Sequence, residues 1–143
     1  MSPEEAAQVA EPRAEDVEEK PSVPAPRLER FIRRDDPIYD AMEFFLLLNP
    51  EEQIPMLGEP ETLRGAGDAA RSSGDSTSAR IKYEDGAKIA LYRQNKEEFR
   101  SLLRLAEEVT PADSKFAAYH RALLRGTDQA MRVAREYYKQ ARR

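Results

Sequence analysis

The sequence has no cysteine and only one histidine among its 143 residues. Without cysteine the chain has no disulfide framework, no Cys-ligated zinc site and no thiol nucleophile. A chain free of disulfides fits a reducing compartment. The first residues are acidic and contain no apolar stretch of the kind that a signal peptide needs, so we expect a cytoplasmic protein.

Long apolar runs are also missing. The longest, Phe44–Leu48, is far too short to cross a bilayer, and we expect no membrane contact. Many of the ten prolines and six glycines gather in two stretches. The rest, about 90 residues, can bury only a modest core. We therefore expect a protein partner or self-association to add stability.

The proline- and glycine-rich stretches divide the chain into four parts. Residues 1–28 have too few large apolar side chains to offset the entropy of ordering, and we predict a disordered acidic, Pro-rich tail. Residues 29–64 are predicted to form N-terminal helices. Residues 65–79 are rich in Gly and Ser, which is typical of a flexible linker. Residues 80–143 are predicted to form a basic four-helix segment.

Charge is distributed unevenly along the sequence. The net charge is -4 for residues 1–36, -6 for residues 37–79 and +6 for residues 80–143. Two interpretations stay open at this point. Either the two halves attract one another or simply keep the protein in solution, or the basic half offers a surface to an anionic partner.

Helix start signals recur along the sequence. Asp36-Pro37 predicts a helix that begins with an aspartate cap and a proline in the first position. Capping boxes at 49–52, 95–98 and 110–113 predict three more starts. No segment shows the two-residue alternation of a strand. The predicted fold class is therefore all-α, either a small antiparallel helical bundle or an array of helical hairpins.

The helix expected at residues 37–48 has a wide apolar arc. A helix in the core explains such an arc, and a surface that faces a protein partner is the alternative. The residues assigned to protein-partner binding on this alternative are Met42, Phe44, Phe45 and Leu47.

Basic side chains recur at helical spacing along the last predicted helices. The planar guanidinium of arginine grips phosphate, so rows of this kind can follow a nucleic-acid backbone without reading its sequence. An ordinary charged helix surface and the docking of an acidic protein segment are the alternatives. The residues assigned to nucleic-acid or anionic-partner binding are Arg93, Lys96, Arg100, Arg104, Arg121, Arg125, Arg132, Arg135, Lys139 and Arg142.

Two turns in the basic segment are similar to the turn between the helices of a tetratricopeptide repeat. They are Leu91–Phe99 and Leu124–Ala130, about 31 residues apart, where the family has a period of about 34. Further matching positions are Tyr83, Gly86, Ala106, Thr110 and Pro111. The resemblance covers residues 80–141 and implies a concave surface that binds peptide or protein, without chemistry. A generic pair of helical hairpins is the alternative.

No combination of residues points to catalysis, a metal or a cofactor. His120 has no acidic residue four positions before or after it, and the serines cluster only in the predicted linker, which cannot hold a nucleophile against a base. We predict that the chain is not an enzyme. The predicted function is a non-catalytic helical interaction module, an adaptor or accessory subunit of a larger assembly. The alternative is a small nucleic-acid-associated subunit.

Overall fold

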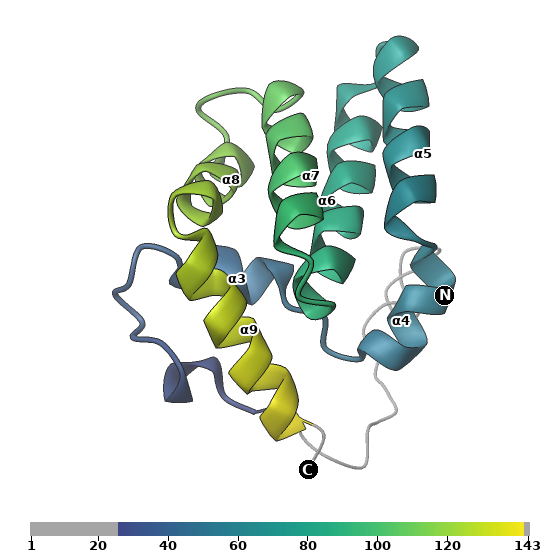
Figure 1. The fold of residues 1–143 in the computed structure, drawn as a ribbon. Helices are drawn as coiled ribbons and strands as arrows, with labels where there is room; N and C mark the ends of the chain where they lie inside the picture. The colour runs from purple at the N-terminus through teal and green to yellow at the C-terminus, as the bar shows by residue number, and fades with distance from the viewer. Residues whose placement is uncertain (1–25, 142–143) are drawn as a thin grey trace, which may run out of the picture.

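The computed structural model describes residues 26–141, and all regular structure in this range is helical (Figure 1). The elements are η1 (Leu28–Arg30), α3 (Tyr39–Phe45), α4 (Pro50–Leu57), α5 (Pro60–Ser72), α6 (Ser76–Tyr92), α7 (Lys96–Glu108), α8 (Lys115–Arg125) and α9 (Thr127–Ala141). The all-α prediction is confirmed. The predicted tail lies outside the described residues except at its end, where Leu28 is buried.

Helices α5, α6 and α7 lie side by side and antiparallel (Figure 1). Two glycines permit the close packing of these helices. A Cβ atom added at Gly67 would lie 2.5 Å from Cε1 of the Tyr83 ring, and one added at Gly86 would lie 3.0 Å from Cδ1 of Leu102. Both glycines therefore act as small residues at helix contacts.

The prediction of a flexible linker at residues 65–79 is wrong. Helix α5 contains the first half of this segment, and α6 begins at Ser76, before the predicted start at Arg80. The tight turn between them uses Gly74, whose φ is 86°, and Asp75 caps α6 through the N–H of Ser78. Packing of α5 on α6 compensates for the low helix propensity of Gly and Ser, which composition alone does not reveal.

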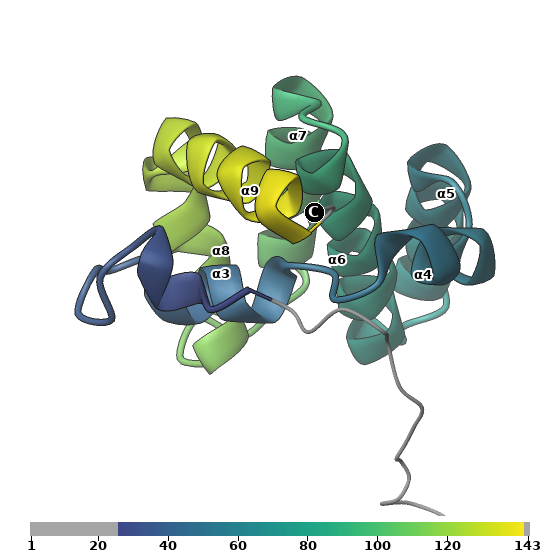
Figure 2. The same cartoon turned by 90° about the horizontal axis from the view of Figure 1, so that it is seen from below.

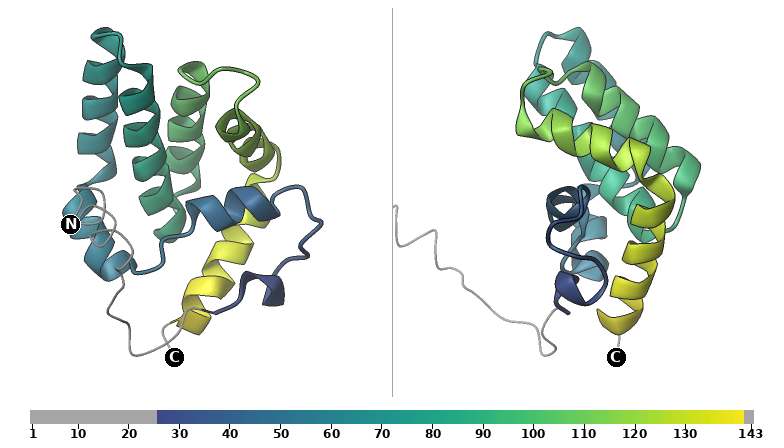
Figure 3. Two further views of the ribbon diagram at one scale, coloured as in Figure 1. Left: turned by 180° about the vertical axis from the view of Figure 1, so that it is seen from behind. Right: turned by 90° about the vertical axis from the view of Figure 1, so that its left-hand side faces the viewer.

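Helices α3 and α9 complete the core beside the ends of α6, α7 and α8 (Figures 2 and 3). The chain turns at the end of α8, and α9 leaves in a different direction, so this pair is not the antiparallel hairpin that the short turn predicted. The Tyr138 hydroxyl of α9 accepts the Leu47 N–H at 2.7 Å. The Phe31 ring lies edge-on to Tyr137, with 6.0 Å between ring centroids, and holds η1 against α9.

The predicted helix starts are only partly confirmed. Asn95 caps α7 by accepting the Glu98 N–H at 3.2 Å, as expected. The Asp36 carboxylate accepts a backbone N–H, but regular helix begins three residues later. The Thr110 hydroxyl donates back to a carbonyl of α7 instead of opening the next helix, so its capping box is wrong. Ser114 caps α8 instead.

Candidate functional site

Helix α4 lies at the edge of the molecule and has no buried residue (Figure 1). It begins at Pro50, a position where a backbone N–H would have no partner inside the helix. The predicted capping box with Glu52 is wrong, because Asn49 makes no side-chain cap and its N–H donates to Gln53 Oε1 at 2.7 Å. Gly58, with φ 105°, ends the helix.

The two faces of α4 have different surroundings. Ile54 and Leu57 are half-buried and pack against a small core of Leu47, Leu63 and Ile89, which anchors α4 to α5 and α6. The opposite face is exposed to solvent. It consists of Glu51, Glu52, Pro55 and Met56.

Exposed apolar side chains gather on and beside this outer face. Met56 is 84% exposed, and Leu48, just before the helix, is 73% exposed. Among the described residues, Ile81 at 42% is the only other large apolar side chain with high exposure. Neither Leu48 nor Met56 is among the site residues predicted from the sequence, although Met56 is out of phase with the inward-facing Ile54 and Leu57. We name the following set the α4 surface: Leu48, Glu51, Glu52, Pro55 and Met56.

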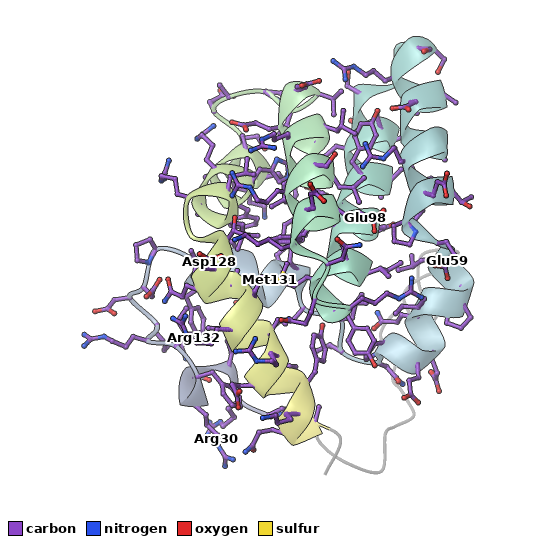
Figure 4. The ribbon with its side chains drawn as sticks, in the orientation of Figure 1. Arg30, Glu59, Glu98, Asp128, Met131 and Arg132 are labelled. Carbon is purple, nitrogen blue, oxygen red and sulfur yellow. The ribbon has the colours of Figure 1, made fainter. Side chains whose placement is uncertain are left out.

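The α4 surface lies in an acidic part of the chain. From Glu43 to Leu63 the sequence has five glutamates and no lysine or arginine. Glu59, at the start of α5 (Figure 4), binds Arg93 through both carboxylate oxygens at 2.6 and 3.2 Å. The hydrogen bond to Arg93 lowers the pKa of the Glu59 carboxyl. The two glutamates of the α4 surface form no ion pair within the described residues.

Three of the four protein-binding residues predicted on α3 and its C-terminal extension are in the interior, so the prediction is wrong for them. Met42 and Phe45 have no exposed area, and Leu47 is 4% exposed. Phe44 is half-buried, with its ring 5.4 Å from that of Phe116. The wide apolar arc exists because α3 packs against both α6 and α8. Burial in the same core raises the pKa of the Tyr138 hydroxyl, which accepts the Leu47 N–H.

Three of the predicted anion-binding residues connect helices within the fold. Arg93 links the end of α6 to the start of α5 through its hydrogen bond to the Glu59 carboxylate. Lys96 Nζ lies 2.7 Å from an Asp128 oxygen and ties α7 to α9. Arg100 donates to the Leu124 carbonyl at 2.7 Å and to the Thr127 hydroxyl. These two hydrogen bonds join α7 to the end of α8. These side chains form contacts within the fold, although Arg93 and Lys96 are exposed, and their binding to an anionic partner stays a prediction.

The other predicted basic residues that the structure describes form loose ion pairs or none. Arg135 and Lys139 lie 3.9 and 3.6 Å from Glu136, in loose and exposed ion pairs. Arg142 lies outside the described residues. Those that form no ion pair with a described residue are Arg104, Arg121, Arg125 and Arg132. Arg121 is half-buried, and the other three are exposed.

The single histidine lies in the centre of the fold. His120 has no exposed area, and its Nε2 lies 2.7 Å from Oε2 of Glu84, which is 2% exposed. Arg80 donates to the other oxygen of Glu84 at 2.7 Å and lies over the Phe116 ring, 3.8 Å from its centroid. His120 Nδ1 has no hydrogen-bond partner in the described structure, which favours the tautomer that donates from Nε2. Because the ring is sealed from solvent, we assign this group a structural role.

Local spacing could not reveal this buried group. Glu84 and His120 are 36 residues apart, whereas helical spacing indicates partners only within about one turn of the same helix. Arg80 and Glu84, four residues apart on one helix, were the available signal of a charged pair on α6.

Comparison with protein-family models, with curated proteins and with solved structures finds no match to this chain. The resemblance to tetratricopeptide repeats therefore stays a prediction. Between residues 26 and 141, no three His, Asp or Glu side chains gather closely enough to hold a metal ion. In the same range, no helix is both long and apolar enough to cross a membrane.

Proposed function

We propose that this chain is a non-catalytic helical interaction module, which acts in the cytoplasm as an adaptor or accessory subunit of a larger assembly. The α4 surface carries this proposal, because Leu48, just before the helix, and Met56, near its end, expose 73% and 84% of their area. Large apolar side chains that stay exposed together are typical of protein contact sites.

The support beneath the α4 surface favours a binding role. Ile54 and Leu57 fix the inner face of α4 on Leu63 and Ile89, so the outer face is presented on an anchored helix. A surface of this kind binds with a smaller loss of conformational entropy than a mobile loop. The proposal therefore replaces the interior residues of α3 with the α4 surface as the protein-binding region.

Capture followed by reconstitution tests the proposed function. The full-length chain, tagged at its C-terminus, is used to retain proteins from an extract of the cells that encode it, and each retained protein is purified and recombined with the chain. Size-exclusion chromatography with light scattering then measures the mass of the complex. We expect one complex of fixed stoichiometry. A chain that stays a stable monomer with every retained protein contradicts the proposal.

A specific observation also favours nucleic-acid binding as a second candidate function. Arg104, Arg125 and Arg132 are exposed and form no ion pair with described residues. Because η1 packs against α9, Arg30 and Arg132 lie on the same side of the molecule (Figure 4). Exposed arginines of this kind can contact phosphates without reading a base sequence.

A salt series tests the second candidate. Binding of the full chain to single- and double-stranded DNA and RNA is measured from low to physiological salt, where phosphate contacts give a steep loss of affinity. Arg104→Glu combined with Arg125→Glu should weaken binding equally across sequences. If no nucleic acid binds in a salt-dependent manner at low ionic strength, this candidate is excluded.

A further inference from the structure

Within α4, a glutamate lies one helical turn before each of the two exposed apolar residues of the α4 surface. Met56 follows Glu52 by four residues, and Pro55 follows Glu51 by four residues, all on the outer face of one helix. Residues four apart on a helix lie one above the other. Leu48 extends the apolar part beyond the start of the helix. Along α4 the two glutamates therefore lie between Leu48 on one side and Pro55 and Met56, about one helical turn away, on the other.

No described residue forms an ion pair with these carboxylates. The sequence has no lysine or arginine from Glu43 to Leu63. Arg93, which reaches this end of the fold, is occupied by both oxygens of Glu59. A partner that covers Met56 must therefore place its own groups beside two glutamates. Cationic groups there gain favourable pairing, whereas acidic groups are repelled.

We propose that the α4 surface binds a basic amphipathic helix of another protein, a proposal that rests on the interaction function above and names its partner class. The partner's apolar side chains cover Leu48 and Met56. Its lysine or arginine side chains, about one turn away on the same helix, pair with Glu51 and Glu52. The apolar contact supplies most of the affinity, and the charges select the partner and speed its association.

The two glutamates also suit the first turn of α4, because the helix dipole favours acidic groups there. That structural effect is separable from binding. Glu51→Gln with Glu52→Gln keeps the shape of both side chains and removes their charge. If the proposal holds, this variant binds the partner helix less tightly and loses most of the salt dependence of binding.

A designed peptide serves as the probe for this partner class. It carries lysine and leucine at helical spacing, and two control peptides replace every lysine by glutamate or every leucine by serine. Binding to the full-length chain is measured by fluorescence anisotropy at low and physiological salt. We expect the Lys/Leu peptide to bind at least about ten-fold more tightly than either control, the effect of roughly one good contact residue.

Methionine methyl signals locate the bound peptide. With ¹³C-methyl methionine, the exposed Met56 reports on the α4 surface, whereas the buried Met42 and Met131 report on the core. We expect the Met56 signal to shift on titration while those of Met42 and Met131 stay in place. Tight peptide binding without a shift at Met56 would place the peptide elsewhere and overturn the proposal.

Matched variants complete the test. Leu48→Ser with Met56→Ser should raise the Kd of the Lys/Leu peptide by about ten-fold or more, and because both side chains are exposed the fold should be unaffected. Ile81→Ser removes an exposed apolar side chain from α6 and should leave the Kd within about two-fold. Equal effects of the two changes would contradict the proposal.

The outcomes separate this proposal from the one on which it rests. If the acidic peptide binds as well as the basic one, or if neither binds, the basic partner is excluded while the general interaction function stands. If the chain forms concentration-dependent dimers that Leu48→Ser with Met56→Ser abolishes, a second copy occupies the surface and the basic helix does not. The general function fails only if no protein forms a complex with the chain.

Discussion

Glu84 and His120 form a buried hydrogen bond of 2.7 Å that joins α6 to α8 at the centre of the fold. Arg80 binds the other carboxylate oxygen, so the charge of Glu84 is balanced from the solvent side. The histidine completes the set of hydrogen bonds that allows a carboxylate to remain in the interior. This is the most deeply buried polar pair of the described structure, and it links α6 to α8.

Removal of the histidine should destabilise the fold strongly. His120→Ala leaves a cavity and deprives the buried Glu84 of a hydrogen bond, so we expect the free energy of unfolding to fall by about 3 kcal/mol. Urea denaturation measures the change, and a double-mutant cycle with Glu84→Ala should give a coupling above about 0.5 kcal/mol. Lys115→Ala, at the exposed start of the same helix, is the control. A loss below 1 kcal/mol, roughly the size of a surface substitution, would contradict the structural role.

Two glycines in α5 should respond in opposite ways to the same substitution. Gly67→Ala forces a Cβ atom against the buried Tyr83 ring, so we expect a loss of about 1–3 kcal/mol in stability. Gly65 has open space around it, and Gly65→Ala should raise stability by up to about 1 kcal/mol through helix propensity. Thermal or urea unfolding compares the two. Gains from both would indicate that α5 does not pack closely on α6.

Asp85 should make stability depend on pH. Burial raises the pKa of the Asp85 carboxyl, and the nearby Glu84 adds to this, although Lys88 and Lys82 oppose it. The folded state therefore holds the proton more tightly than the unfolded state, and this contribution to stability is lost as pH rises through the folded pKa. Asp85→Asn should stabilise the protein at pH 7.

The pH series provides the check on that prediction. The advantage of Asp85→Asn over the wild type should shrink as the pH is lowered toward and below 3.8, the ordinary value for aspartate. Urea unfolding at several pH values measures the difference. Asp113→Asn, in the exposed loop before α8, should show little change at any pH. A difference for Asp85→Asn that grows on acidification would reverse the sign and refute the prediction.

Arg100 and Arg104 should behave differently despite their spacing of one helical turn. Arg100 donates to the end of α8, so Arg100→Ala should lower stability by about 1–2 kcal/mol. Arg104 is exposed, and Arg104→Ala should change stability by less than about 0.5 kcal/mol. Urea denaturation of both variants measures the two changes in the free energy of unfolding. If Arg104→Ala is the more damaging change, the assignment of Arg100 as a helix connector is wrong.

Much of the helical pattern is predictable from the sequence because apolar periodicity and caps act locally. The Asn95 cap and the apolar face of α7 are examples. The linker prediction for residues 65–79 is wrong because contacts between helices, and not local sequence, decide the structure of this segment. Its glycine content suggests flexibility, but Gly67 is needed where Tyr83 packs on α5, a contact that only the folded arrangement creates.

The candidate sites were harder to predict because they depend on which faces the fold covers. The apolar arc that contains Met42 and Phe45 is compatible with a surface or a core, and only the packing of α6 and α8 decides for the core. Arg100 and Arg104 lie one helical turn apart on α7, yet only Arg100 donates to a carbonyl of the next helix. Met56 becomes a candidate only when the inner face of α4 is known.

The central claim is that the chain works by binding a protein through the α4 surface. The most direct measurement is the affinity of the reconstituted complex for wild-type chain, for Leu48→Ser with Met56→Ser, and for Ile81→Ser. We predict that the first and third bind the partner with the same Kd and that the double variant binds about ten-fold or more weakly. Equal affinity for all three chains would contradict the claim.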